Sequence, residues 1–150
     1  MAQFNAELPE KLIKDFELLA KNTEKMLADM TKAGAKVVEQ NVKRNVPRKD
    51  LARYVRVSRA YKTPTDGGIN TQVYISGYMP FKGNRTSFTQ KRGVSTRRGV
   101  PADFIAKIFE YGRSTAPFPK KPFLRKSFRK AEIEQAMEKV QDDYLKKVKG

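Results

Sequence analysis

Cysteine and histidine are both absent from the 150 residues of the chain. Without cysteine there is no disulfide framework, no thiolate metal site and no thiol nucleophile. Without histidine the chain lacks the usual general base at neutral pH and the commonest zinc ligand. Carboxylates are therefore the remaining candidates for catalysis, and any metal site would have to be built from oxygen ligands.

A convincing pair of catalytic carboxylates is also missing. Asp103 and Glu110 are seven residues apart and can share a helix face. Asp103 is better explained as an acid in the first turn of a helix, and Glu110 as a partner for a nearby backbone group or for Arg125. Asp66-Gly67-Gly68 is a turn, because the lysine and helix of a phosphate loop do not follow it. We therefore expect a non-enzymatic protein with no catalytic residue, cofactor or metal.

Long apolar runs are lacking as well. None approaches the ~18 residues of a membrane span, and hydrophobic residues make up only 39% of the chain against 32% charged residues. A chain of 150 residues has the length of one domain. We expect a single domain over residues 1–150, with a modest core, no membrane partner and assembly in the cytoplasm.

Acidic residues are scarce in the middle of the chain. The net charge is +16, which indicates an anionic partner without choosing among nucleic acid, acidic protein faces and anionic lipid. Residues 47–100 contain 12 basic and 2 acidic side chains, whereas residues 1–46 contain 8 and 7, and residues 101–150 contain 12 and 7. The middle segment is therefore the predicted anion-facing part.

A long helix is predicted from Pro9 and Glu10, which suit a first turn, to the residue before Pro47. Its length would be roughly 55 Å at 1.5 Å per residue, more than a compact domain of this size buries. One end is therefore expected to pack on a neighbouring subunit, and Gly34 is a candidate break or bend. The predicted apolar stripe comprises Leu12, Phe16, Leu19, Thr23, Met26, Met30, Ala33 and Val37.

Residues 53–61 alternate with a period of two and are rich in β-branched side chains, which predicts a strand. The turn residues 63–68 follow, and residues 69–77 are predicted as the second strand of a hairpin. Residues 78–100 show no period of their own and are predicted to form a long basic loop.

This loop combines cations with two phenylalanines. The combination fits a nucleic-acid surface, but Phe81 and Phe88 in a polar loop are better explained by burial against another chain. The residues predicted to form a partner interface are Phe81, Lys82, Arg85, Phe88, Lys91, Arg92, Arg97 and Arg98.

The last third of the chain predicts two further helical stretches. Apolar residues within 104–109 have helical spacing and Gly112 stops them, and prolines then force an extended path to an amphipathic helix over 124–148. The predicted fold class is α+β, with a long N-terminal helix and a C-terminal helix packed on a small antiparallel β-sheet, together with the long basic loop.

The stretch Ile108-Phe109-Glu110-Tyr111-Gly112 is followed by Ala116-Pro117-Phe118-Pro119 and Pro122-Phe123-Leu124-Arg125. This pattern resembles the signature of a family of small tailed-bacteriophage neck and tail-completion proteins. In that family an aromatic-Glu-aromatic-Gly step precedes a Pro-Phe-Leu-Arg opening of the last helix. The order of predicted elements is similar too. One departure lies in residues 47–53, which lack the glycine of the family's turn, so the start of the first strand is open by a few residues.

The resemblance implies a structural virion protein at the head-tail junction, assembling as a ring subunit that completes the tail or joins it to the head. Its implied partners are copies of itself, with a hexamer as one candidate, adjacent neck and tail proteins, and genomic DNA in the channel as a candidate contact. Its implied location is the virion, after assembly in the host cytoplasm. The alternatives are a basic nucleic-acid-binding protein and a tail terminator at a neighbouring position.

The family motif also has a purely structural interpretation. Gly112 would take a positive φ and Phe123 would enter the core, so that the motif fixes the turn between the sheet and the last helix. The motif residues concerned are Glu110, Tyr111, Gly112, Pro122, Phe123, Leu124 and Arg125.

Overall fold

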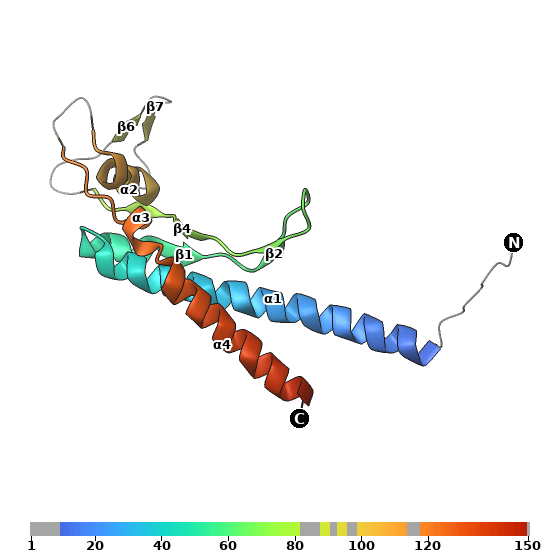
Figure 1. Ribbon diagram of the computed structural model, residues 1–150. Coiled ribbons are helices and arrows are strands. Elements are labelled where there is room, and N and C mark those ends of the chain that lie inside the picture. The colour runs from blue at the N-terminus through green and yellow to red at the C-terminus, as the bar shows by residue number, and fades with distance from the viewer. Residues whose placement is uncertain (1–9, 82–87, 91–92, 96–98, 114–117, 150) are drawn as a thin grey trace, which may run out of the picture.

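The computed structural model describes residues 10–81, 88–90, 93–95, 99–113 and 118–149. A long N-terminal helix, a C-terminal helix and small antiparallel sheets form an α+β structure, which confirms the predicted fold class (Figure 1). In chain order the elements are α1 (Glu10–Asn45), the 3-10 helix η1 (Lys49–Tyr54), β1 (Val55–Val57), β2 (Tyr61–Lys62), β3 (Ile69–Asn70), β4 (Val73–Ile75), β5 (Tyr78–Met79), β6 (Phe88–Gln90), β7 (Gly93–Ser95), β8 (Val100–Pro101), α2 (Ala102–Tyr111), α3 (Leu124–Ser127) and α4 (Lys130–Lys149).

Helix α1 runs without interruption for 36 residues and ends two residues before Pro47, as predicted. The expected break at Gly34 is absent. A Cβ at Gly34 would lie 3.0 Å from Ile133 Cγ2 and 3.4 Å from Met137 Cγ, both on α4. The glycine therefore allows α4 to pack closely on α1, and its cost in helix propensity is offset by this helix–helix contact.

The predicted hairpin is present, but its strands are shorter than expected. The first strand begins at Val55, because residues 49–54 form the 3-10 helix η1. Strand β1 pairs antiparallel with β4, and β2 pairs with β3. Between these ladders the Ser58 hydroxyl accepts a hydrogen bond from the Gln72 N–H at 2.8 Å, which replaces a backbone acceptor and interrupts the strand.

Residues 78–100 differ from the predicted loop at several positions. Strand β5 pairs with β8, and β6 forms a short hairpin with β7. The β5–β8 pair depends on Gly99, which has a φ of +98°, and a Cβ there would lie 2.1 Å from the Met79 carbonyl oxygen. Such short strands have too few residues to show a period of two, so the sequence pattern could not indicate them.

Helix α2 confirms the prediction over 104–109, but the predicted C-terminal helix is divided into α3 and α4. The division lies at Phe128, whose ψ of 85° is not helical. Helix α1 supplies the competing hydrogen bonds, because Asn41 Nδ2 donates to the Ser127 carbonyl at 3.3 Å and Asn45 Nδ2 donates to Ser127 Oγ at 3.1 Å. Side-chain donors on α1 thus turn the chain between α3 and α4.

The core lies at the end of the molecule where α1 finishes. Its buried side chains come from α1, η1, β1, β5, α2 and the start of α3, and they are Val42, Leu51, Val55, Met79, Ala102, Ala106, Phe109 and Phe123. The first turns of α1 extend beyond both the hairpin and α4 (Figure 1). One end of the molecule is thus packed on several sides, whereas the other is a single projecting helix.

Candidate assembly surfaces

Glu110 is the most deeply buried acidic side chain among the described residues, and it joins α2 to α3. Its side chain is 2% exposed. Oε2 accepts hydrogen bonds from the N–H groups of Phe123 at 2.9 Å and Leu124 at 3.0 Å, and Oε1 accepts from Arg125 Nε at 2.8 Å. The carboxylate thereby caps the N-terminus of α3, where unpaired backbone donors favour a negative charge. We call Glu110 with its partners at 123–125 the Glu110 clamp.

The clamp sets the ionisation of Glu110. Burial raises its pKa, but the hydrogen bonds from Arg125 and from the backbone of Leu124 and Phe123 together outweigh burial, so the pKa lies below its ordinary value of 4.5. Arg125 also lies 5.7 Å from the centre of the Tyr111 ring. Its charge therefore contacts both the acid and an aromatic ring.

The remaining motif residues shape the same connection. Gly112 has a φ of +79°, and a Cβ there would lie 3.0 Å from the Phe118 carbonyl oxygen. The Phe118 ring packs edge-on against Phe109 at 5.3 Å, and Phe123 is only 2% exposed. The structure thus brings the motif residues together around the path from α2 to α3, with Tyr111 and Arg125 on the outside.

The predicted partner interface is only partly described. Phe81 is half-buried and lines a small hollow of about 260 Å³ with η1 and β5 residues. Phe88 lies in β6, where the backbone alone is described. The other residues of the set lie outside the described residues, namely Lys82, Arg85, Lys91, Arg92, Arg97 and Arg98.

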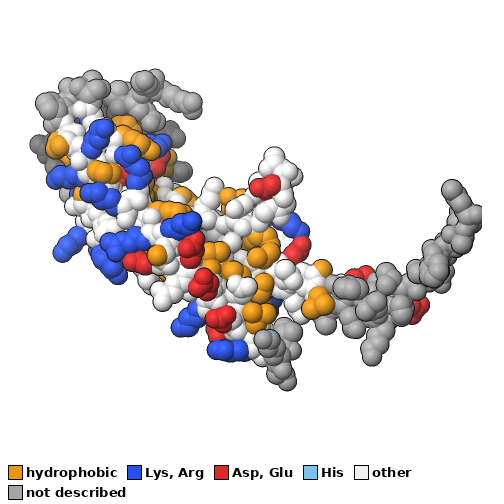
Figure 2. Space-filling view, viewed as in Figure 1, with side chains coloured by type: hydrophobic (Ala, Val, Ile, Leu, Met, Phe, Trp, Pro, Cys, Tyr) orange, Lys and Arg blue, Asp and Glu red, His pale blue; other side chains and the backbone are white. Residues whose placement is uncertain are grey.

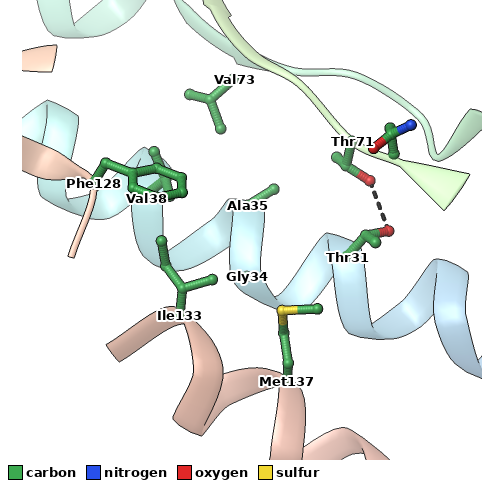
Figure 3. Close-up of a pocket in the computed structure, with 10 residues that line it drawn as sticks. Thr31, Gly34, Ala35, Val38, Thr71, Val73, Phe128, Ile133 and Met137 are labelled. Atoms are coloured by element: carbon green, nitrogen blue, oxygen red, sulfur yellow. Dashed lines mark hydrogen bonds between the residues drawn. The ribbon is translucent and has the colours of Figure 1, made fainter. Parts of the chain in front are cut away.

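A groove between α1, α4 and the hairpin was not anticipated from the sequence. It has a volume of about 340 Å³, and Ala35, Val38, Val73, Ile133 and Met137 supply apolar side chains to it (Figure 3). Its rim includes Phe128, which is 66% exposed. We call this the apolar groove.

One polar contact closes an end of the apolar groove. Thr31 of α1 and Thr71 of the hairpin are joined by a hydroxyl–hydroxyl hydrogen bond of 3.0 Å (Figure 3). Asp29 also accepts a 2.5 Å hydrogen bond from the Tyr144 hydroxyl, which ties α4 to α1 and raises the pKa of Tyr144. These contacts hold the elements around the groove in place.

Among the described residues, the first part of α1 shows no such contacts. The described side chains between residues 14 and 25 are all exposed, including Leu19 at 52%. The first described link between α1 and another element is the ion pair of Glu24 with Lys62 of the hairpin. Residues 10–23 therefore project by roughly 21 Å, at 1.5 Å per residue. We call them the α1 arm.

The space-filling view shows how these surfaces are arranged. Apolar side chains gather between α1, α4 and the hairpin, and Lys and Arg gather over the opposite end, around α2 and α3 (Figure 2). The sequence predicts a candidate break or bend at Gly34, whereas a glycine inside a long helix can also indicate close packing and could have pointed to the groove. The hairpin wall could not be placed from the sequence, because its contacts with α1 link residues far apart in the chain.

Residues 10–77 match the model of a protein family described as "Bacteriophage HK97-gp10, putative tail-component". This match supports the resemblance to tailed-phage neck and tail proteins that the sequence indicated. The match covers α1, η1 and the hairpin through β4, whereas the motif that carried the resemblance lies at 108–125. No curated protein and no solved structure matches the chain.

The description of the matched family supports a structural role in a bacteriophage tail. In the described part of the chain no group of acidic side chains is arranged to hold a metal ion. None of the described helices combines the length and apolar character of a membrane-spanning helix.

Proposed function

We propose that this tail component is a ring subunit at the head-tail junction, where it completes the tail or joins it to the head without enzymatic activity. Its described surfaces are suited to contacts between subunits. The described side chains of the α1 arm are all exposed, and the apolar groove is open in the same molecule. The observation that carries the proposal is the presence of both a helical end whose described side chains are exposed and an open apolar groove.

A ring needs two different faces on each subunit. In a heterologous interface one face of a subunit binds a different face of its neighbour. The ring closes when the successive rotations between neighbours bring the last subunit back to the first. We assign the α1 arm to one face and the apolar groove to the other. Leu19 of one copy would then enter the groove of the next and remove apolar surface of both from water.

The segment 78–100 serves a second contact in this proposal. Its cations and Phe81 lie away from the α1 arm in the chain and fit an acidic rim of an adjacent neck or tail protein. A triple change of Arg92, Arg97 and Arg98 to serine is then expected to impair assembly more than folding. Normal particle yield with this triple change would remove the segment from the interface.

Engineered cysteines test the subunit contact directly, because the chain has none of its own. A variant with both Leu19→Cys and Phe128→Cys places one thiol on the α1 arm and one on the rim of the groove. Mild oxidation of assembled tails should link neighbouring copies into a ladder that ends at the number of subunits in the ring. The two single-cysteine variants are the matched controls, and neither should form more than dimers.

Electron microscopy of particles that lack the protein tests the position in the virion. Full heads with separate tails, or tails with defective upper ends, are the expected result. Intact infectious particles would contradict a role at the junction. A cysteine ladder together with normal head-tail joining would support the ring but move it elsewhere in the tail.

A further inference from the structure

A second groove lies at the other end of α1, beside the core. Its lining comprises Asn45, Pro47, Lys120, Lys121, Pro122, Phe123, Lys126 and Arg129, and its volume is about 530 Å³. No acidic side chain lines it. We call it the basic groove. It is separate from the basic segment 78–100 that the sequence indicated.

The lysines of the basic groove are free to meet an anion. Within the described chain, Lys120, Lys121 and Lys126 are exposed and make no ion pair or side-chain hydrogen bond. Other cations near the core are already paired, as Arg48 is with Asp50 and Arg125 with Glu110. Arg129 of the groove is likewise paired with Glu132 at 3.1 Å. The positive charge that is not compensated within the described chain is therefore that of the three lysines.

The backbone beneath these lysines is held in place before any ligand arrives. The Lys121 N–H donates to the Phe109 carbonyl at 2.8 Å, and the Glu110 clamp fixes residues 123–125. Phe123 is buried beneath the groove. Because the fold fixes the backbone that carries the lysines, little ordering of the backbone is required on binding.

The composition of the groove favours DNA over a protein partner. The centres of protein interfaces are depleted in lysine and enriched in aromatic side chains. This groove has three lysines and an arginine, and its one aromatic residue is buried. Lysine instead binds phosphate as a point charge, and it supplies the salt-dependent, sequence-independent part of DNA binding.

We propose that the basic groove binds the phosphodiester backbone of duplex DNA without reading its sequence. Each lysine that contacts a phosphate releases counterions from the DNA, so the affinity should fall steeply with salt. This inference goes beyond the proposed ring and does not depend on it, since a single copy carries the whole groove.

The test compares two triple variants of the full chain that lose the same charge. The groove variant is Lys120→Gln, Lys121→Gln and Lys126→Gln, and the control is Lys14→Gln, Lys21→Gln and Lys25→Gln on exposed positions of α1. Fluorescence anisotropy with a short duplex at several salt concentrations gives the Kd and its salt slope. The groove variant should bind at least about tenfold more weakly, with a salt slope reduced by about 2 to 3, and the control should change much less.

Equal weakening in the two variants would overturn the proposal, because binding would then follow net charge and not the groove. If the unchanged protein did not bind the duplex at all, the proposal would be overturned too. Poly-glutamate is the second probe. If the unchanged protein bound it as tightly as DNA, and the groove variant bound it more weakly, the groove would be assigned to an acidic protein partner and not to DNA. Thermal melting of both variants verifies that they remain folded. The cysteine cross-linking experiment tests the proposed ring independently of DNA binding.

Discussion

The two halves of α1 differ sharply in how far their described side chains are buried. Around residues 35–42 the helix buries Ala35, Asn41 and Val42 against α3, α4 and the core. In the α1 arm every described side chain is exposed. Both halves have the same helical pattern in the sequence, so the pattern alone does not reveal which half is packed.

This difference shows what each half is able to do. Isolated helices shorter than ~12 to 15 residues are marginal in water, so the α1 arm gains stability mainly from the rest of α1 and from partners. The packed half is fixed by tertiary contacts and by the side-chain bonds of Asn41 and Asn45. Changes at the packed end should therefore affect folding, and changes at the arm should affect assembly.

Phe123→Ala should have the largest effect on stability. Phe123 is 2% exposed, and its removal leaves a cavity beside Leu51 and the rest of the core. We expect the free energy of unfolding to fall by about 3 to 5 kcal/mol, which thermal or urea unfolding of the isolated chain will measure. Unchanged melting together with lost assembly would contradict the structural role of the motif.

Glu110→Gln should have the next largest effect on stability. The neutral amide cannot pair with Arg125 and leaves at least one backbone donor of α3 poorly satisfied, so we expect a loss of about 2 to 3 kcal/mol. The pKa of Glu110 is lowered in the folded state, so its contribution is complete above the ordinary value of 4.5 and is lost as the pH falls through the folded value. Unfolding measured against pH should therefore show a smaller acid-induced loss of stability in the variant than in the unchanged protein.

Gly34→Leu tests the junction between the two halves. The new side chain would collide with Ile133 and Met137 and push α4 away from α1, at a cost of about 1 to 3 kcal/mol despite better helix propensity. Unfolding in urea gives the change in stability. Lys36→Leu is the control, because Lys36 is exposed on the same helix and a leucine there does not face a closely packed α4 as it does at Gly34. An equal or higher stability for Gly34→Leu would show that α4 is not closely packed there.

Leu19→Ser should have the smallest effect on folding. Leu19 is 52% exposed, so the free energy of unfolding should change by less than about 0.5 kcal/mol. Incorporation into tails should nevertheless fall, because the arm would lose apolar area that the next subunit buries. Lys21→Ser is a matched control on the exposed arm. If both variants entered tails normally, the arm would have no part in the interface.

The sequence predicted the elements that depend on local signals. Pro47 ended α1, Gly112 ended α2, and the turn at 63–68 joined the hairpin. Local periodicity and turn chemistry are sufficient for such features. Local signals did not reveal η1. They did not reveal the break at Phe128 either, because that break is fixed by Asn41 and Asn45 from a distant part of the chain.

The candidate surfaces show the same limit. The interior of the motif was expected to involve Glu110 with a backbone group or Arg125, and these are the partners that the Glu110 clamp contains. Neither groove was predicted, since each is built from segments that meet only in three dimensions. Lys120 and Lys121 had no distinguishing pattern in the sequence, and only folding places them beside Asn45.

Hydrogen exchange of α1 in the free protein and in assembled tails tests the central contrast most directly. In the free protein the amides of residues 14–23 should exchange much faster than those of residues 35–45. Assembly should slow exchange in the first group and leave the second nearly unchanged, because a neighbouring subunit covers the arm. If residues 14–23 exchanged equally fast in assembled tails, the arm would be uncovered in the virion and the proposed subunit contact would be wrong.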